Sequence, residues 1–115
     1  MYNGQVKTRR RLRRKIKLEP VLEFGNKCDF AIIDVTESGG AAGGKKRGTI
    51  TIDYAPADVR QLVAEGKDLN GALAYYHDRI YSLVKYYISG DWECVQGYEE
   101  AMDIIRRHIE PHFAD

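Results

Sequence analysis

Residues 15–35 have the sequence KIKLEPVLEFGNKCDFAIIDV, which contains two strand patterns joined by a turn. Over residues 15–24, apolar and charged side chains alternate, as they do in a strand with one buried face. Gly25 and Asn26 favour a turn. Residues 28–35 are apolar at odd and even positions alike, which is typical of a central strand with both faces covered. The stretch therefore predicts two neighbouring strands of one sheet.

A third strand is predicted further along the chain. Residues 49–54 again alternate between apolar and polar side chains, and this period of two indicates a strand. Pro20 has no amide hydrogen to donate, so we place the strand over residues 15–24 at an edge of the sheet. We expect three strands, all antiparallel.

Helices follow these strands. After Tyr54 the apolar residues recur at three- and four-residue steps, which is the period of an α-helix. This pattern predicts helices over residues 56–65, 68–89 and 91–110, each followed by a glycine or a proline. The predicted fold class is α+β: an N-terminal three-stranded antiparallel sheet, followed by three helices that pack on it. Residues 15–115 are expected to form this single domain.

The apolar positions of these elements give the predicted core. Each strand contributes the side chains on one face, and each helix contributes one stripe. The expected core contains Ile16, Leu18, Phe30, Ile32, Ile50, Ile52, Leu73, Tyr76, Ile80, Leu83, Val95, Met102 and Ile105.

The length and composition limit the class of protein. The chain has 115 residues, of which 43% are hydrophobic, enough for one domain with its own core. No apolar run approaches the ~20 residues that span a membrane, and no apolar segment of a secretory signal follows the N-terminal charges. Cys28 and Cys94 stand outside any CxxC spacing, as expected of buried cysteines in the reducing cytoplasm. We expect a cytoplasmic protein with no membrane partner.

The net charge of +1 hides a strong asymmetry along the chain. Residues 1–47 contain 12 Lys or Arg against 5 Asp or Glu, whereas residues 48–115 contain 6 against 12. The basic half attracts polyanions and the acidic half repels them. This asymmetry indicates either nucleic acid or an acidic protein surface as the partner.

The positive charge is concentrated in an N-terminal arm, residues 1–14, and in the start of the first strand. Between residues 7 and 17 the chain has eight cationic and no acidic side chains. Arginine dominates the run, and its guanidinium group binds phosphate oxygens in a fork. The residues predicted to bind nucleic acid in this run are Lys7, Arg9, Arg10, Arg11, Arg13, Arg14, Lys15 and Lys17.

A glycine-rich hairpin loop over residues 38–48 carries a second basic cluster. Gly39, Gly44 and Lys45 match the GxxxxGK spacing of a nucleotide-binding loop. However, Lys46 stands where that motif needs Ser or Thr, and a strand follows where it needs a helix. We interpret the loop as a flexible basic finger, with a plain hairpin connection as the alternative. Its predicted nucleic-acid-binding residues are Lys45, Lys46 and Arg47.

These features predict a small, non-enzymatic protein that binds the phosphate backbone of DNA or RNA with little sequence specificity. Other interpretations of the basic run stay open: it has no ligand, it binds an acidic protein, or it docks on the acidic half of a second copy. The alternative function is a protein-binding adaptor or inhibitor, such as a phage, plasmid or virion accessory protein. It would act through the acidic last helix or a tyrosine-rich helix.

The tyrosine-rich face lies on the long predicted helix. Tyr75, Arg79 and Tyr86 follow one another at helical spacing. Tyr and Arg are the residue types that most often anchor protein interfaces. We therefore predict a protein contact at these three residues and expect the chain to form a homo-oligomer.

The sequence contains no pattern typical of an active site or a metal site. His108 and His112 are four residues apart, but Pro111 interrupts the helical register between them. Cys28 and Cys94 are remote from both histidines, so four independent ligands would have to converge. We predict no catalytic residue, no metal and no cofactor.

Overall fold

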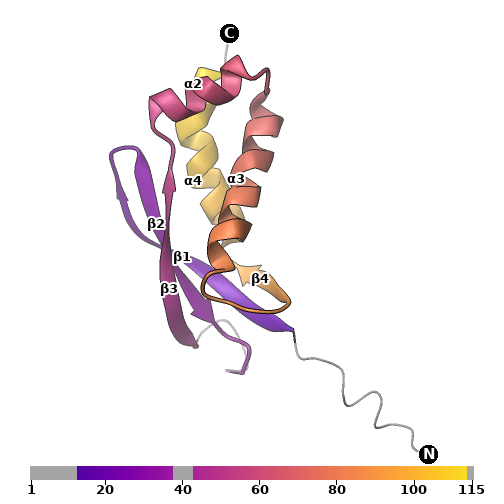
Figure 1. Cartoon of the computed structure of the whole chain (residues 1–115). Coiled ribbons are helices and arrows are strands. Elements are labelled where there is room, and N and C mark those ends of the chain that lie inside the picture. The colour runs from indigo at the N-terminus through magenta and orange to yellow at the C-terminus, as the bar shows by residue number, and fades with distance from the viewer. Residues whose placement is uncertain (1–12, 38–42, 114–115) are drawn as a thin grey trace, which may run out of the picture.

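The structure is a computed structural model that describes residues 13–37 and 43–113 (Figure 1). These residues form four strands and three α-helices, and the helices carry the labels used in Figure 1. The strands are β1 (Arg14–Phe24), β2 (Lys27–Asp34), β3 (Lys45–Asp53) and β4 (Trp92–Gln96). The helices are α2 (Pro56–Ala64), α3 (Leu69–Val84) and α4 (Tyr98–Ile109), followed by the short 3-10 helix η1 (Glu110–His112).

The four strands form one mixed sheet in the order β3-β2-β1-β4. β1 pairs with β2, and β2 with β3, both in antiparallel register. These pairings confirm the α+β class and the first three strands. The prediction of a purely antiparallel, three-stranded sheet is wrong, because β4 joins the far side of β1 in parallel.

β4 replaces the start of the predicted third helix. Gly97 ends the strand with a φ of +92°, a backbone conformation that favours glycine. A Cβ atom at this position would lie 2.0 Å from the backbone oxygen of Leu18, so only glycine allows β4 to approach β1. Val95, predicted to be in the core, is consequently 47% exposed. α4 begins only at Tyr98.

The prediction that residues 15–24 form an edge strand is wrong, because β1 lies between β2 and β4. The ladder with β4 covers Arg14 to Lys17 and stops before the proline. Within the described residues, the second half of β1 therefore has only β2 as a strand neighbour. Its other side is open, and on that side the missing amide hydrogen of Pro20 costs no ladder bond.

Helices cover one face of the sheet. Figure 1 shows α3 and α4 side by side against that face, with α2 across the end distant from β4. Asp68 caps α3 by accepting a hydrogen bond from the amide of Gly71 at 2.8 Å. α3 ends at Val84, five residues before the predicted end, and residues 85–91 cross over to β4.

The core between the sheet and the helices follows the prediction closely. Nine of the thirteen predicted core residues are buried: Ile16, Leu18, Phe30, Ile32, Ile50, Ile52, Tyr76, Ile80 and Ile105. Leu73, Leu83 and Met102 are only partly buried and pack at its margin. Cys28 is buried as expected, whereas Cys94 is partly exposed. Burial raises the pKa of the Cys28 thiol to about 11, with smaller contributions from Glu23 and Asp29.

Candidate nucleic-acid interface

The strongest candidate site lies where β1 and β3 begin and β2 ends. Arg14 forms an ion pair with Asp34 across the sheet, with 2.9 Å between Nη1 and Oδ2. In the β2–β3 register Asp34 lies opposite Lys45. These side chains border a depression of about 310 Å³. We call it the basic end; its lining residues are Arg14, Asp34, Glu37, Gly44, Lys45 and Arg47.

The antiparallel order of the first three strands produces this arrangement. β1 leads away from the basic end, β2 returns to it and β3 leads away again. Both basic segments of the sequence therefore attach at the same end of the sheet. Lys7, Arg9, Arg10 and Arg11 lie outside the described residues, as do residues 38–42 of the loop.

A single carboxylate organises the basic end. Partial burial favours the neutral form of Asp34 and is the largest single effect, but hydrogen bonds from Thr36 and the nearby positive charges together outweigh it. Arg14 and Arg47 add positive charge nearby. The net result is a pKa of Asp34 below its usual value, so the carboxylate is ionised at neutral pH. It balances one of the three cations that line the depression.

The remaining predicted cations are distributed differently. Arg13 lies 3.9 Å from Glu93, and its side chain is exposed. Lys17 pairs with Glu19 at 3.2 Å, and only 13% of its side chain is exposed. Lys15 is exposed and shares with Lys17 the face of β1 opposite the buried side chains. The structure therefore brings Arg14, Lys45 and Arg47 together, while Lys15 and Lys17 lie on the open face of the sheet.

The predicted tyrosine face is divided as well. Tyr75 and Arg79 line a depression of about 270 Å³ together with Asp53 and Asp58. Tyr86 lies beyond the end of α3, is 83% exposed and does not line this depression. The predicted face therefore does not form one continuous surface along α3.

The sequence pattern did not indicate that Tyr87 is an exposed aromatic residue near the basic end. The helical pattern places it in the core stripe, yet it is 40% exposed. Its ring occupies the space above Gly48, where a Cβ atom would lie 2.2 Å from the ring. A glycine inside a strand pattern, directly after the basic triplet, was the available signal of such a close approach.

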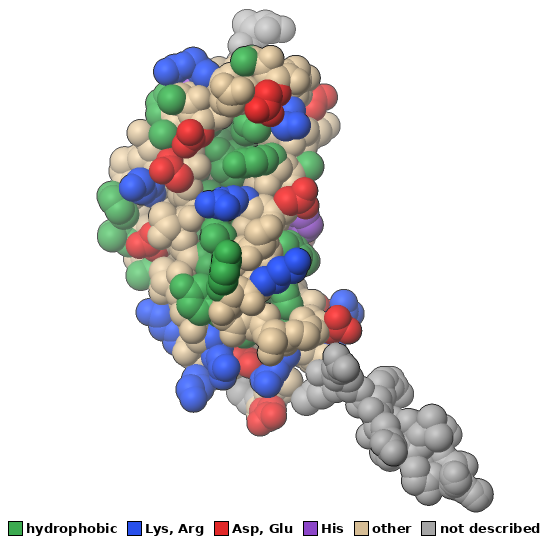
Figure 2. All heavy atoms as spheres, viewed as in Figure 1, with side chains coloured by type: hydrophobic (Ala, Val, Ile, Leu, Met, Phe, Trp, Pro, Cys, Tyr) green, Lys and Arg blue, Asp and Glu red, His purple; other side chains and the backbone are tan. Residues whose placement is uncertain are grey.

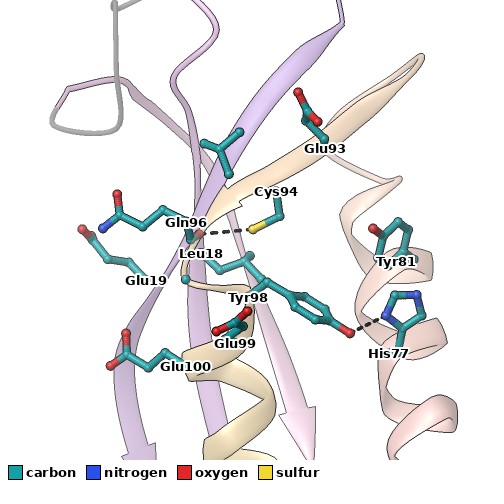
Figure 3. Close-up of a pocket in the computed structure, with 12 residues that line it drawn as sticks. Leu18, Glu19, His77, Tyr81, Glu93, Cys94, Gln96, Tyr98, Glu99 and Glu100 are labelled. Atoms are coloured by element: carbon teal, nitrogen blue, oxygen red, sulfur yellow. Dashed lines mark hydrogen bonds between the residues drawn. The ribbon is translucent and has the colours of Figure 1, made fainter.

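A second depression, of about 540 Å³, has the opposite charge (Figure 3). Its lining residues come from β1, α3, β4 and the start of α4. Within the described chain, none of these residues is Lys or Arg. We call it the acidic cleft after its four carboxylates, which are Glu19, Glu93, Glu99 and Glu100.

The acidic cleft contains one thiol and one linked pair of polar rings. The thiol of Cys94 donates a hydrogen bond to the carbonyl oxygen of Gln96 at 3.2 Å. Burial raises the pKa of Cys94 despite hydrogen bonds from the backbone, so the thiol stays protonated and is a weak nucleophile. Figure 3 shows Tyr98 reaching from α4 to His77 on α3, where the two side chains are hydrogen-bonded. The Nδ1 atom of His77 is thus engaged with Tyr98.

The remaining histidine prediction concerns metal binding. His108 donates from Nδ1 to the carbonyl oxygen of Ile104 at 2.9 Å, and its Nε2 lies 3.3 Å from Glu23. Within residues 13–37 and 43–113, no group of three or more His, Cys, Asp or Glu side chains is placed to hold a metal ion. In the same ranges no helix is long and apolar enough to cross a membrane.

Comparison with known proteins gives no relative for this chain. No family model, no curated protein and no solved structure matches it.

Proposed function

We propose that the protein is a non-enzymatic nucleic-acid-binding protein that holds the phosphate backbone at its basic end. The observation that carries this proposal is the convergence of Arg14, Lys45 and Arg47 at one depression, where Arg14 pairs with Asp34. Asp34 and Glu37 supply two carboxylates against these three cations, so the depression keeps an excess of positive charge that can meet phosphate oxygens.

The attachment of the two basic segments supports the same proposal. The arm enters β1 at the basic end and the loop enters β3 there, so their charges add to those of the depression. If six to eight cations contact phosphates, log Kd changes with log salt concentration with a slope of about 5 to 7. Contacts of Lys and Arg with phosphates carry no base information, so little sequence preference is expected.

The acidic cleft supports a single orientation of the nucleic acid. Its four carboxylates repel a polyanion, whereas the basic end attracts one. Nucleic acid bound at the basic end would therefore run away from Glu19 on β1 and from Glu99 and Glu100 at the start of α4.

The test measures binding of labelled single-stranded and duplex DNA and RNA at several salt concentrations. The intact chain should bind, and binding should weaken steeply with salt. Replacing Lys45, Lys46 and Arg47 together with Ala should reduce the salt slope by about 2 to 3, since each phosphate contact contributes about one unit.

A matched control removes three cations elsewhere. The three residues are exposed, belong to or adjoin the helices and are distant from the basic end: Arg60, Lys67 and Arg106. Replacing these three with Ala changes the net charge equally and should leave the salt slope within about one unit of the original. The proposal fails if the intact protein does not bind at low salt, or if both triple variants behave alike.

A second candidate function is protein binding, first of all to a second copy of the chain. The depression that contains Tyr75 and Arg79 also contains Asp53 and Asp58, so it offers an aromatic anchor and both charges to a partner surface. Sedimentation at tens of micromolar should show a dimer that is lost on Tyr75→Ala. A strict monomer would exclude self-association.

A further inference from the structure

A half-exposed tyrosine stands beside the basic end and has no role in the core. Three ring atoms of Tyr87 lie 2.2 to 2.8 Å from the position of a Cβ on Gly48. The ring thus rests on the backbone of β3, where any larger residue would displace it. The residue is still 40% exposed, so part of its surface is available to a ligand.

The segment that carries this ring is fixed on both sides. The amides of Tyr87 and Ile88 donate hydrogen bonds to the carbonyl oxygen of Val84, each at 2.9 Å. Ile88 is only 4% exposed and anchors the crossover in the core. The ring is therefore held in place before any ligand arrives, so that binding to it orders few additional torsion angles.

Cations are close to the ring along the chain. Arg47 directly precedes Gly48 in β3, and the crossover that carries Tyr87 begins with Lys85. At its other end the crossover meets the basic end, because the carbonyl oxygen of Asp91 accepts a hydrogen bond from the amide of Arg14 at 3.0 Å. Figure 2 shows hydrophobic side chains surrounded by Lys and Arg in the part of the molecule around the start of β3.

We propose that Tyr87 is a stacking platform for an unpaired base, so that the basic end takes single-stranded nucleic acid in preference to duplex. A fixed aromatic ring among cations is the combination that binds single strands, because the cations follow the phosphates while the ring stacks on a base. In a duplex each base is already stacked on its neighbours, and the ring has no free base face to contact. This inference rests on the proposed function and adds the class of strand.

The test compares Tyr87→Leu and Tyr87→Phe in the full chain. Leucine covers Gly48 but cannot stack, whereas phenylalanine keeps the stacking surface. Binding is measured by fluorescence anisotropy with labelled oligo-dT, oligo-U and a duplex of equal length. Tyr87→Leu should weaken single-strand binding about 5- to 50-fold and leave duplex binding unchanged. Tyr87→Phe should stay within about twofold of the original protein.

Two further variants make the result decisive. Gly48→Ala keeps the tyrosine at position 87 but displaces its ring from β3. It should weaken single-strand binding comparably, and it tests the proposal even if Tyr87→Leu fails to fold. Phe24→Leu removes a similarly exposed aromatic ring, 49% exposed, from the end of β1 distant from the basic end and should have no effect on binding. Neither substitution removes a charge, so the salt slopes should stay the same.

The outcomes separate this inference from the proposed function. If the intact protein binds both strands with a steep salt slope, but Tyr87→Leu and Gly48→Ala bind single strands as tightly as it does, the platform is refuted and the phosphate site stands. Equal losses for single strand and duplex also refute the platform. If the intact protein binds no nucleic acid at low salt, both proposals fail.

Discussion

The basic end and the acidic cleft are both built on β1, yet they carry opposite charge for different physical reasons. Arg14 belongs to the basic end and Glu19 to the acidic cleft, about 16 Å apart along an extended strand. Two carboxylates of the cleft, on Glu99 and Glu100, lie in the first turn of α4. There the partial positive charge of the helix terminus stabilises them.

The cations of the basic end lack such an internal explanation. Asp34 pairs with Arg14, whereas Lys45, Arg47 and the carboxylate of Glu37 are exposed, which leaves an excess of one positive charge in the depression. The comparison teaches that a near-neutral protein can keep its acidic residues for helix stability while its basic residues remain available to a ligand. This is why the basic end, and not the larger cleft, carries the proposed function.

The largest expected effect comes from breaking the acidic cleft at Gly97. In Gly97→Val the new Cβ would meet the backbone oxygen of Leu18 at 2.0 Å, at a φ of +92°. The junction of β4 and α4 must then leave β1, and we expect the free energy of unfolding to fall by more than about 4 kcal/mol. Urea unfolding followed by circular dichroism measures this loss.

Gly66→Ala serves as the control for this substitution. Gly66 has a similar φ of +89°, but nothing lies within 4 Å of its Cβ position. Only the backbone penalty remains, about 1 kcal/mol. Similar losses for both variants would show that the approach of Gly97 to β1 is unimportant for stability.

A smaller effect is expected at the basic end from Asp34→Asn. The substitution removes the ion pair with Arg14 and the charge that accepts hydrogen bonds from Thr36. We expect a loss of about 1–2 kcal/mol in stability and, at low salt, a tighter interaction with nucleic acid because the carboxylate paired with Arg14 is gone. Asp103→Asn breaks an exposed pair with Arg107 at 3.7 Å and should cost less than about 0.5 kcal/mol.

We also expect the difference in stability between the original protein and Asp34→Asn to depend on pH, in a definite direction. Because the folded pKa of Asp34 is lowered, its ionised form stabilises the folded protein above the unfolded pKa of about 3.9. This contribution disappears as the pH falls through the lower folded pKa. The stability difference between the original protein and Asp34→Asn should therefore be constant near neutral pH and shrink below about pH 4. A difference that grows with acid would contradict the role given to Asp34.

Local patterns predicted the first three, antiparallel strands, and the order of these strands accounts for the meeting of the two basic segments. Alternation along residues 15–24 and 49–54 is a property of each strand by itself, and antiparallel order then places Arg14 near Lys45. The same patterns failed at residues 92–96. There Val95 shares helical spacing with Tyr98, whereas the deciding contact is between Gly97 and Leu18, far apart in sequence.

Contacts between remote segments were equally invisible for the other site residues. The ring of Tyr87 on Gly48 and the pair of His77 with Tyr98 join elements that no sequence period relates. The ion pair of Lys17 with Glu19 is not visible in the sequence either, because an alternating pattern does not show which charged side chains on one face are paired.

The parallel pairing of β4 also has a consequence for how the protein forms on the ribosome. Trp92 pairs with Arg14, which emerges 78 residues earlier. All three strands from β1 to β3 are present once residue 53 is made. The apolar face of the sheet that contains Phe30 stays uncovered until α3 and α4 are made. Synthesis at about 5–20 residues per second leaves that surface open for several seconds. In this interval the nascent chain depends on chaperones or on its own positive charge to stay apart from its neighbours.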